Sequence, residues 1–140
     1  MSSQPIISNS YLTEIKLQSA PTANQRLKFL DVPELSQRMK GAMVIGVQCF
    51  NATNLTTSPN GFAVVPTLAG IVLTLVEESL ESIYQYPCTD LQPSLNSGFI
   101  RMFNRKKINI SKSYITIFDA VGIAVNQAVV VNFIYETGSR

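Results

Sequence analysis

The feature that most restricts the fold of this chain is the division of its apolar, β-branched residues into short runs. From Tyr11 to Gln18 apolar and polar side chains alternate with a period of two, which is typical of a strand with one buried face. Asn, Gly, Pro or Ser residues separate the runs. The further runs comprise residues 26–30, 41–50, 62–65, 68–77, 82–86, 99–103, 108–110, 114–118 and 128–135. Short strands at this spacing predict an all-β protein, an antiparallel β-sandwich or a barrel of about eight strands.

Some segments allow a more detailed expectation. Residues 41–50 are apolar on both faces, which predicts a central strand covered on both sides. Pro66 separates two β-branched runs and cannot donate to a ladder, so we expect a strand pair bent at that point. Residues 31–36 place a proline beside acidic residues, which predicts a single helical turn capped by Asp31.

The length of 140 residues is that of one domain with one sizeable core. Residues 1–10 are polar and lack a periodic apolar pattern, so we expect an extended N-terminal arm followed by a β-sandwich domain at residues 11–140. The longest apolar stretch, residues 68–76, is far shorter than the roughly 20 residues that span a bilayer, so no transmembrane segment is expected.

The charged residues are few, at 14% of the chain against roughly 25% in soluble domains. This shortage indicates that a partner covers part of the surface. The alternative is a monomer coated with Ser, Thr, Asn and Gln. The net charge of +2 is too small to predict nucleic-acid binding by the chain as a whole.

The chain contains no histidine, which removes the usual general base of neutral-pH catalysis and excludes Ser-His-Asp and Cys-His nucleophiles. With only two cysteines a tetrahedral zinc site is not expected, and no motif predicts a cofactor. Without a secretory signal, Cys49 and Cys88 are expected to be buried free thiols rather than a disulfide. Paired carboxylates are the remaining catalytic option, and the candidates are Glu77, Glu78, Glu81 and Asp90. The better interpretation of these residues is a solvated acidic turn that ends a hydrophobic strand. The chain is therefore not expected to be an enzyme.

Basic residues gather beside aromatic ones between positions 99 and 114. The basic patch comprises Arg101, Arg105, Lys106, Lys107 and Lys112. Single-stranded nucleic acid is bound by such combinations, although residues 104–107 also have the composition of a hairpin tip. An equally good hypothesis is that this tip contacts the acidic turn of a neighbouring subunit and sets its orientation.

Candidate interface residues lie in the N-terminal segment and at three aromatic positions, since aromatic residues are enriched in interfaces. They comprise Gln4, Pro5, Ile6, Ile7, Tyr11, Leu12, Phe62, Tyr84 and Tyr86. The three aromatic residues could equally belong to the core. Three Asn-x-Ser/Thr sites, at Asn51, Asn54 and Asn109, are expected by chance in a chain rich in these residues.

Residues 80–117 (LESIYQYPCTDLQPSLNSGFIRMFNRKKINISKSYITI) follow the order strand, Pro-ended loop, strand, basic turn and strand. With the polar N-terminal segment and a chain that ends soon after a strand, this pattern resembles the single jelly-roll structural proteins of viral and phage capsids. The resemblance implies two four-stranded sheets and an arm that ties subunits together. The segment before Ser10 carries no charged side chain, which favours a vertex (penton) or minor shell protein over one that packages nucleic acid.

The expected function is therefore a structural subunit of a virion that forms a homo-oligomer, a pentamer by preference, and packs against other capsid proteins. Nucleic-acid contact is expected to be minor. The alternative is a β-sandwich binding or adhesion module of a bacterial surface or appendage, with a ligand-binding loop at residues 51–60.

Overall fold

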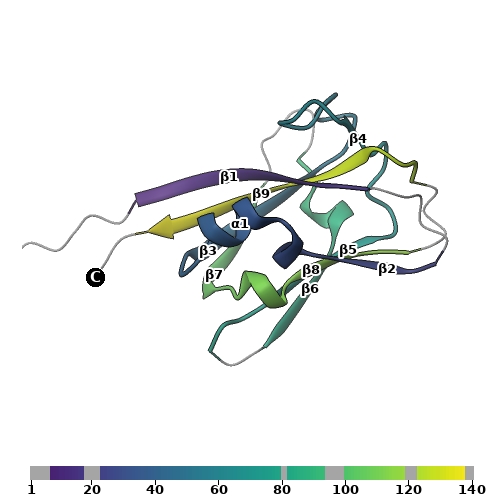
Figure 1. Cartoon of the computed structure of the whole chain (residues 1–140). Coiled ribbons are helices and arrows are strands. Elements are labelled where there is room, and N and C mark those ends of the chain that lie inside the picture. The colour runs from purple at the N-terminus through teal and green to yellow at the C-terminus, as the bar shows by residue number, and fades with distance from the viewer. Residues whose placement is uncertain (1–6, 18–22, 80–81, 94–99, 119–122, 138–140) are drawn as a thin grey trace, which may run out of the picture.

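The computed structural model describes residues 7–17, 23–79, 82–93, 100–118 and 123–137, and these residues form two β-sheets packed face to face (Figure 1). The strands are β1 (Ile7–Lys16), β2 (Gln25–Lys28), β3 (Met43–Phe50), β4 (Ala63–Val64), β5 (Ile71–Val76), β6 (Ile83–Pro87), β7 (Arg101–Lys107), β8 (Tyr114–Ile117) and β9 (Gln127–Thr137). The helical elements are short: the 3-10 turns η1 (Phe29–Asp31), η2 (Cys88–Leu91) and η3 (Ile110–Lys112), and the helix α1 (Pro33–Arg38). Within these residues no helix is long and apolar enough to cross a membrane.

The first sheet has the strand order β1-β9-β3-β7, and the second sheet has the order β2-β8-β5-β6. All neighbours on these two paths are antiparallel. The short β4 adds to β9 in parallel. Apart from β4, the chain changes sheet at every connection except the one between β5 and β6. This is the strand order of a jelly roll, and it confirms the expected all-β sandwich.

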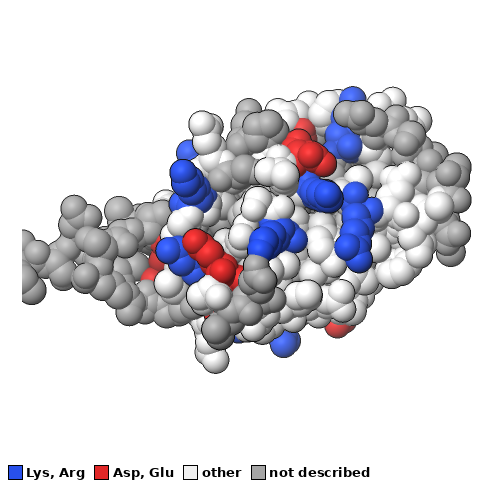
Figure 2. All heavy atoms as spheres, turned by 60° about the horizontal axis from the view of Figure 1, so that its bottom comes forward, with Lys and Arg blue, Asp and Glu red and all other residues white. Residues whose placement is uncertain are grey.

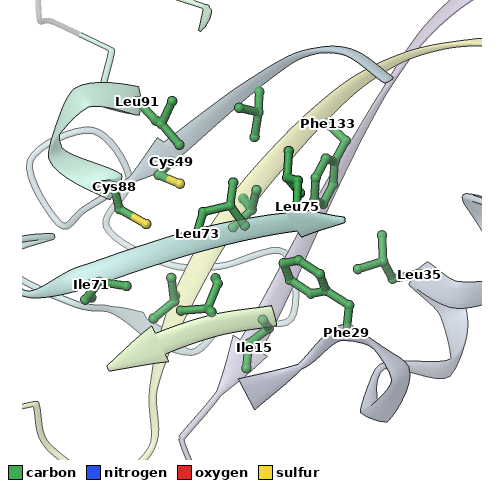
Figure 3. Packing of buried hydrophobic residues seen from close by; sticks show 14 of the residues in the cluster. Ile15, Phe29, Leu35, Cys49, Ile71, Leu73, Leu75, Cys88, Leu91 and Phe133 are labelled. Atoms are coloured by element: carbon green, nitrogen blue, oxygen red, sulfur yellow. The ribbon is translucent and has the colours of Figure 1, made fainter. Parts of the chain in front are cut away.

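The core lies between the sheets and is built by the inward positions of alternating strands. Leu73 and Leu75 of β5 face Phe133 of β9, and all three side chains have no exposed surface (Figure 3). The rings of Phe29 and Phe133 meet edge to face, with centroids 5.7 Å apart. Since Phe29 follows β2 of the second sheet, this contact joins the two sheets.

The central strand β3 is confirmed. It lies between β9 and β7, and nearly all of its side chains are buried or half-buried. The ladder shifts register between Val44 and Gly46, on both sides of β3. A Cβ atom at Gly46 would lie 2.8 Å from Ile100 Cγ2 and 3.1 Å from the carbonyl oxygen of Arg101. The close approach of β7 therefore requires glycine at this position.

The start of the sandwich differs from the expected boundary after Ser10. Strand β1 begins at Ile7, and residues 7–10 pair with residues 137–134 of β9. These four residues are an integral part of the first sheet and not an arm. Residues 1–6 of the expected arm lie outside the described residues. Figure 1 shows the start of β1 and the end of β9 together at one end of the molecule.

Three local expectations were wrong. Pro66 does not bend a strand pair, because β4 belongs to the first sheet and β5 to the second, so the chain crosses between sheets there. Residues 108–110 form an isolated bridge and a 3-10 turn instead of a strand. Helix α1 begins after Val32, and Asp31 is not its cap. The first two depend on tertiary pairing that local sequence does not encode, whereas the start of α1 follows from Pro33 in its first turn.

Candidate functional site

The sandwich has two long sides, one where β6 lies opposite β7 and one where β1 lies opposite β2. At the β6/β7 side, aromatic side chains close the gap between the sheets. Tyr86 of β6 stacks on Phe103 of β7, with ring centroids 5.2 Å apart and an interplanar angle of 25°. Arg101 also lies over the Tyr86 ring, with its Cζ atom 5.9 Å from the ring centroid. This side is filled by the chain itself.

A second cluster continues the same side toward the end of β7. Lys106 Nζ lies 4.2 Å from the ring centroid of Tyr84, and the Tyr84 hydroxyl donates a hydrogen bond to Glu77 Oε2 at 2.8 Å. This hydrogen bond raises the pKa of Tyr84, because the carboxylate stabilises the protonated phenol. Burial likewise raises the pKa of Tyr86.

These contacts bring the acidic turn and the basic stretch together inside one molecule. In addition to the Tyr84 cluster, the main-chain N–H of Glu78 donates to the carbonyl of Lys107 at 2.8 Å, and Glu77 forms a bridge with Ile108. The contact of the acidic turn with the basic stretch of a neighbouring subunit stays a prediction. The expected hairpin tip is wrong, because residues 104–107 lie within β7.

The four basic-patch residues whose side chains are described have different surroundings. Arg101 and Lys106 cover tyrosine rings, Lys107 is exposed at the end of β7, and Lys112 lies on η3. Arg105 lies in β7, and its side chain is outside the described set. Figure 2 shows basic side chains scattered over this face, with acidic ones between them. Such a mixed surface lacks the continuous positive track by which nucleic-acid backbones are bound.

The β1/β2 side is open. A groove of about 1020 Å³ runs between the two edge strands. Its wall includes apolar residues such as Ile15 and Leu27 and a mixture of charges, and the charged lining residues are Glu14, Lys16, Arg26, Lys28 and Asp31. Pro59 and Asn60, from the loop that was expected to bind a ligand, also line it. Since both signs of charge are present, the groove does not select for an ion of either sign.

The four candidate interface aromatics are all half-buried, and a cation of the same chain covers each ring. Besides Tyr84 and Tyr86, Tyr11 lies under Arg38 at 5.2 Å and Phe62 under Lys16 at 4.1 Å. Leu12 differs from them, because 41% of its surface is exposed. Ile7 begins β1. Gln4, Pro5 and Ile6 lie outside the described residues.

On the outward face of the first sheet the sequence indicated only Leu12, and not Gln48, Met102 or Asn132. Leu12 of β1, Asn132 of β9 and Gln48 of β3 lie in one row across the strands. Asn132 Nδ2 donates to Gln48 Oε1 at 3.0 Å, and Asn132 Oδ1 is buried and accepts no hydrogen bond from any described residue. Met102 of β7, which is 59% exposed, lies in the next row. This face, called the Leu12–Met102 face below, combines exposed apolar side chains with a partly buried pair of amide side chains.

The two cysteines are free and fully buried, as expected. Cys49 of β3 and Cys88 of η2 lie side by side between the sheets (Figure 3). A hydrogen bond with Cys88 and burial raise the pKa of Cys49 well above its usual value. The thiolate, which is the reactive form, is therefore suppressed.

The Asn-x-Ser/Thr sites form local turns. Asn51 Oδ1 accepts from the main-chain N–H of Thr53 at 3.0 Å, and Asn109 Oδ1 accepts from that of Ser111 at 3.1 Å. Asn54 Nδ2 donates to the carbonyl of Pro93 at 3.0 Å. The spacing that suggests a glycosylation site thus serves as an Asx turn in two of the three cases.

Among the described residues, no group of three or more Cys, Asp and Glu side chains is placed to hold a metal ion. The chain matches no protein-family model, and neither a curated protein nor a solved structure is detectably similar to it. The interpretation of its surfaces therefore depends on its own residues and strand order.

Proposed function

We propose that this chain is a structural subunit of a virus or phage particle, and that it acts by self-association and by packing against neighbouring shell proteins. The observation that carries the proposal is the strand order β1-β9-β3-β7 over β2-β8-β5-β6. Viral capsid proteins use the double-sheet jelly roll widely, because it needs few exposed sheet edges. Lectins and cupins share this architecture, so the surfaces must distinguish between them.

The surfaces support assembly better than catalysis or ligand binding. Leu12 and Met102 are large apolar side chains that project from one sheet face, beside the amide acceptor of Asn132. Burying such side chains against a neighbour contributes roughly 25 cal/mol per Å² of apolar surface. The absence of histidine removes the metal ligand and base on which many enzymes depend.

We further propose that the Leu12–Met102 face is buried between subunits of a closed homo-oligomer, with a pentamer as the form that a fivefold vertex requires. The test replaces Leu12 and Met102 together with lysine. The matched control is Ile83→Lys on β6 of the second sheet, where an equally exposed apolar side chain (61%) is exchanged for the same charge.

Sedimentation velocity of the full chain is the readout, with circular dichroism to verify the fold of each variant. We expect the wild type and Ile83→Lys to sediment as oligomers and the double variant as a monomer. A wild-type chain that is monomeric at high concentration would contradict the proposed function. If the double variant is still an oligomer, the subunit interface does not lie on the Leu12–Met102 face.

The second candidate is a β-sandwich binding or adhesion module, which the groove between β1 and β2 favours. Its volume of about 1020 Å³ is sufficient for a small ligand or an extended peptide. This function predicts a monomer whose binding is lost when Leu27→Arg fills the groove. The same sedimentation experiment therefore distinguishes the two candidates.

A further inference from the structure

Residues 57–63 form a tight hairpin between β3 and β4, called the 57–63 hairpin here. Thr57 and Ala63 pair in antiparallel fashion, and the Ser58 N–H donates to the Phe62 carbonyl at 2.7 Å. At the tip, the Gly61 N–H donates to the Ser58 carbonyl at 2.9 Å. Gly61 has a φ of +88°, which lies in the region that favours glycine.

Two side chains of β1 hold this hairpin. The Asn60 main-chain N–H donates to Glu14 Oε2 at 3.3 Å, and the Asn60 side-chain amide donates to Glu14 Oε1. Lys16 Nζ lies over the Phe62 ring at 4.1 Å. Glu14 and Lys16 both project from the side of β1 that faces away from the core. The contacts between Glu14 and Asn60 are called the latch below.

We propose that Asn60 is a deamidation site and that its modification opens the latch. The main-chain nitrogen of Gly61 attacks Asn60 Cγ, a new C–N bond forms, and the side-chain nitrogen leaves as ammonia. Water then opens the resulting succinimide and yields aspartate or isoaspartate. No oxidant or cofactor is needed. Asn60 and Gly61 are exposed, and nothing lies within 4 Å of a Cβ built at Gly61, so water can reach the reacting residues.

The same contacts control the rate of the reaction. The attacking nitrogen is engaged with Ser58, and the amide that must leave is held by Glu14. The reaction therefore proceeds from the fraction of molecules in which the tip has opened, which makes the latch a brake on its own modification.

Deamidation of Asn60 replaces an attractive contact with Glu14 by a repulsive one. The side-chain NH2 group that donates to Glu14 is replaced by an oxygen, so a carboxylate faces the carboxylate of Glu14, and only the main-chain N–H of residue 60 remains as a donor. Like charges at this separation repel, and neither group can donate a hydrogen bond. The hairpin then cannot close on β1 as before, so the modification separates the tip from this edge of the first sheet irreversibly.

The test is to incubate the full folded chain at mildly alkaline pH and to follow Asn60 by peptide mass mapping. We expect conversion at Asn60 in the wild type and a rate at least about threefold to tenfold higher in Glu14→Ala, since each net hydrogen bond lost changes the open population by this order and this variant removes both latch contacts. Glu78→Ala, which removes an exposed carboxylate in the turn after β5, is the matched control and should leave the rate unchanged. If Asn60 stays intact in the folded chain while the urea-unfolded chain converts, or if Glu14→Ala has the wild-type rate, the proposal is wrong.

A second pair of variants tests the opening directly and does not depend on the reaction rate. Hydrogen exchange of the Ser58 and Phe62 amides should be faster in Asn60→Asp than in Asn60→Ala, because only the former adds repulsion to the loss of the donor. Equal exchange in the two variants would overturn the proposed opening of the latch. The amides of β9 serve as the internal control for global stability.

Discussion

Replacing Phe133 with alanine should destabilise the sandwich strongly, because this ring joins the two sheets. Its side chain has no exposed surface and meets Phe29 edge to face at 5.7 Å and 83°. The lost transfer free energy and the remaining cavity together cost about 3–5 kcal/mol for a buried phenylalanine. Domains of this kind are stable by only about 5–15 kcal/mol, so the change removes a large fraction of the total.

The loss can be expressed as a melting temperature. Unfolding entropies of about 2.1 cal/mol/K per residue give roughly 0.3 kcal/mol/K for this chain, so Phe133→Ala should lower the Tm by about 10–17 °C. Urea denaturation followed by circular dichroism measures the free energy of unfolding, with little change expected in the m-value. The control is Phe118→Ala, which removes the same side chain where it is 39% exposed and should cost less than about 1 kcal/mol. Equal losses in the two variants would refute the stacked-sheet core.

Further predictions concern β3, the β6/β7 side and the thiols. Gly46→Ala should destabilise the chain by about 1–3 kcal/mol in urea denaturation, because the new Cβ would meet a side chain at 2.8 Å and the main chain of β7 at 3.1 Å. Glu77→Gln should lower the pKa of Tyr84 toward its usual value, which ultraviolet titration of the phenol measures. Since the folded pKa of Tyr84 exceeds the unfolded value of about 10, its contribution to stability is complete below that pH and is lost as the pH rises through the folded pKa. Cys49 and Cys88 should react with a thiol reagent only slowly in the native chain and rapidly in denaturant, because both are fully buried and the pKa of Cys49 is raised; rapid native labelling would contradict their position.

Local sequence patterns predicted the strands well where one face is buried. The alternation that begins at Tyr11 lies in β1 as far as Lys16, and the continuous apolar run at residues 41–50 contains the central strand β3. These patterns succeed because the side-chain period of a strand is a property of the backbone. The Asn60-Gly61 turn was likewise predictable, since it requires a positive φ that glycine adopts.

Pairing between distant segments could not be predicted in the same way. The parallel pairing of β4 with β9 joins residues 63–64 to residues 127–128, and the sequence of neither segment indicates that the other is its partner. The bond between Gln48 and Asn132 likewise spans 84 positions. The sequence patterns around Leu12 and around Asn132 do not indicate that these two residues lie in one row across the first sheet. Such contacts depend on topology and register, which single-sequence patterns do not contain.

The basic stretch shows why residue composition alone misplaced the candidate site. Arg101 and Lys106 were grouped as a patch because they are close in sequence, but each covers a tyrosine of β6. Cations near aromatic residues serve internal packing as readily as external binding. To distinguish internal packing from external binding, one must know which strand lies opposite the cation, and this depends on the fold.

The most direct measurement of the proposed assembly is native mass spectrometry of the full-length chain, sprayed from near-physiological salt over a range of concentrations. The account predicts a dominant closed species at a fixed whole-number multiple of 15.4 kDa, five by preference, with few intermediate sizes. A spectrum that contains only the 15.4 kDa species at every concentration would contradict it.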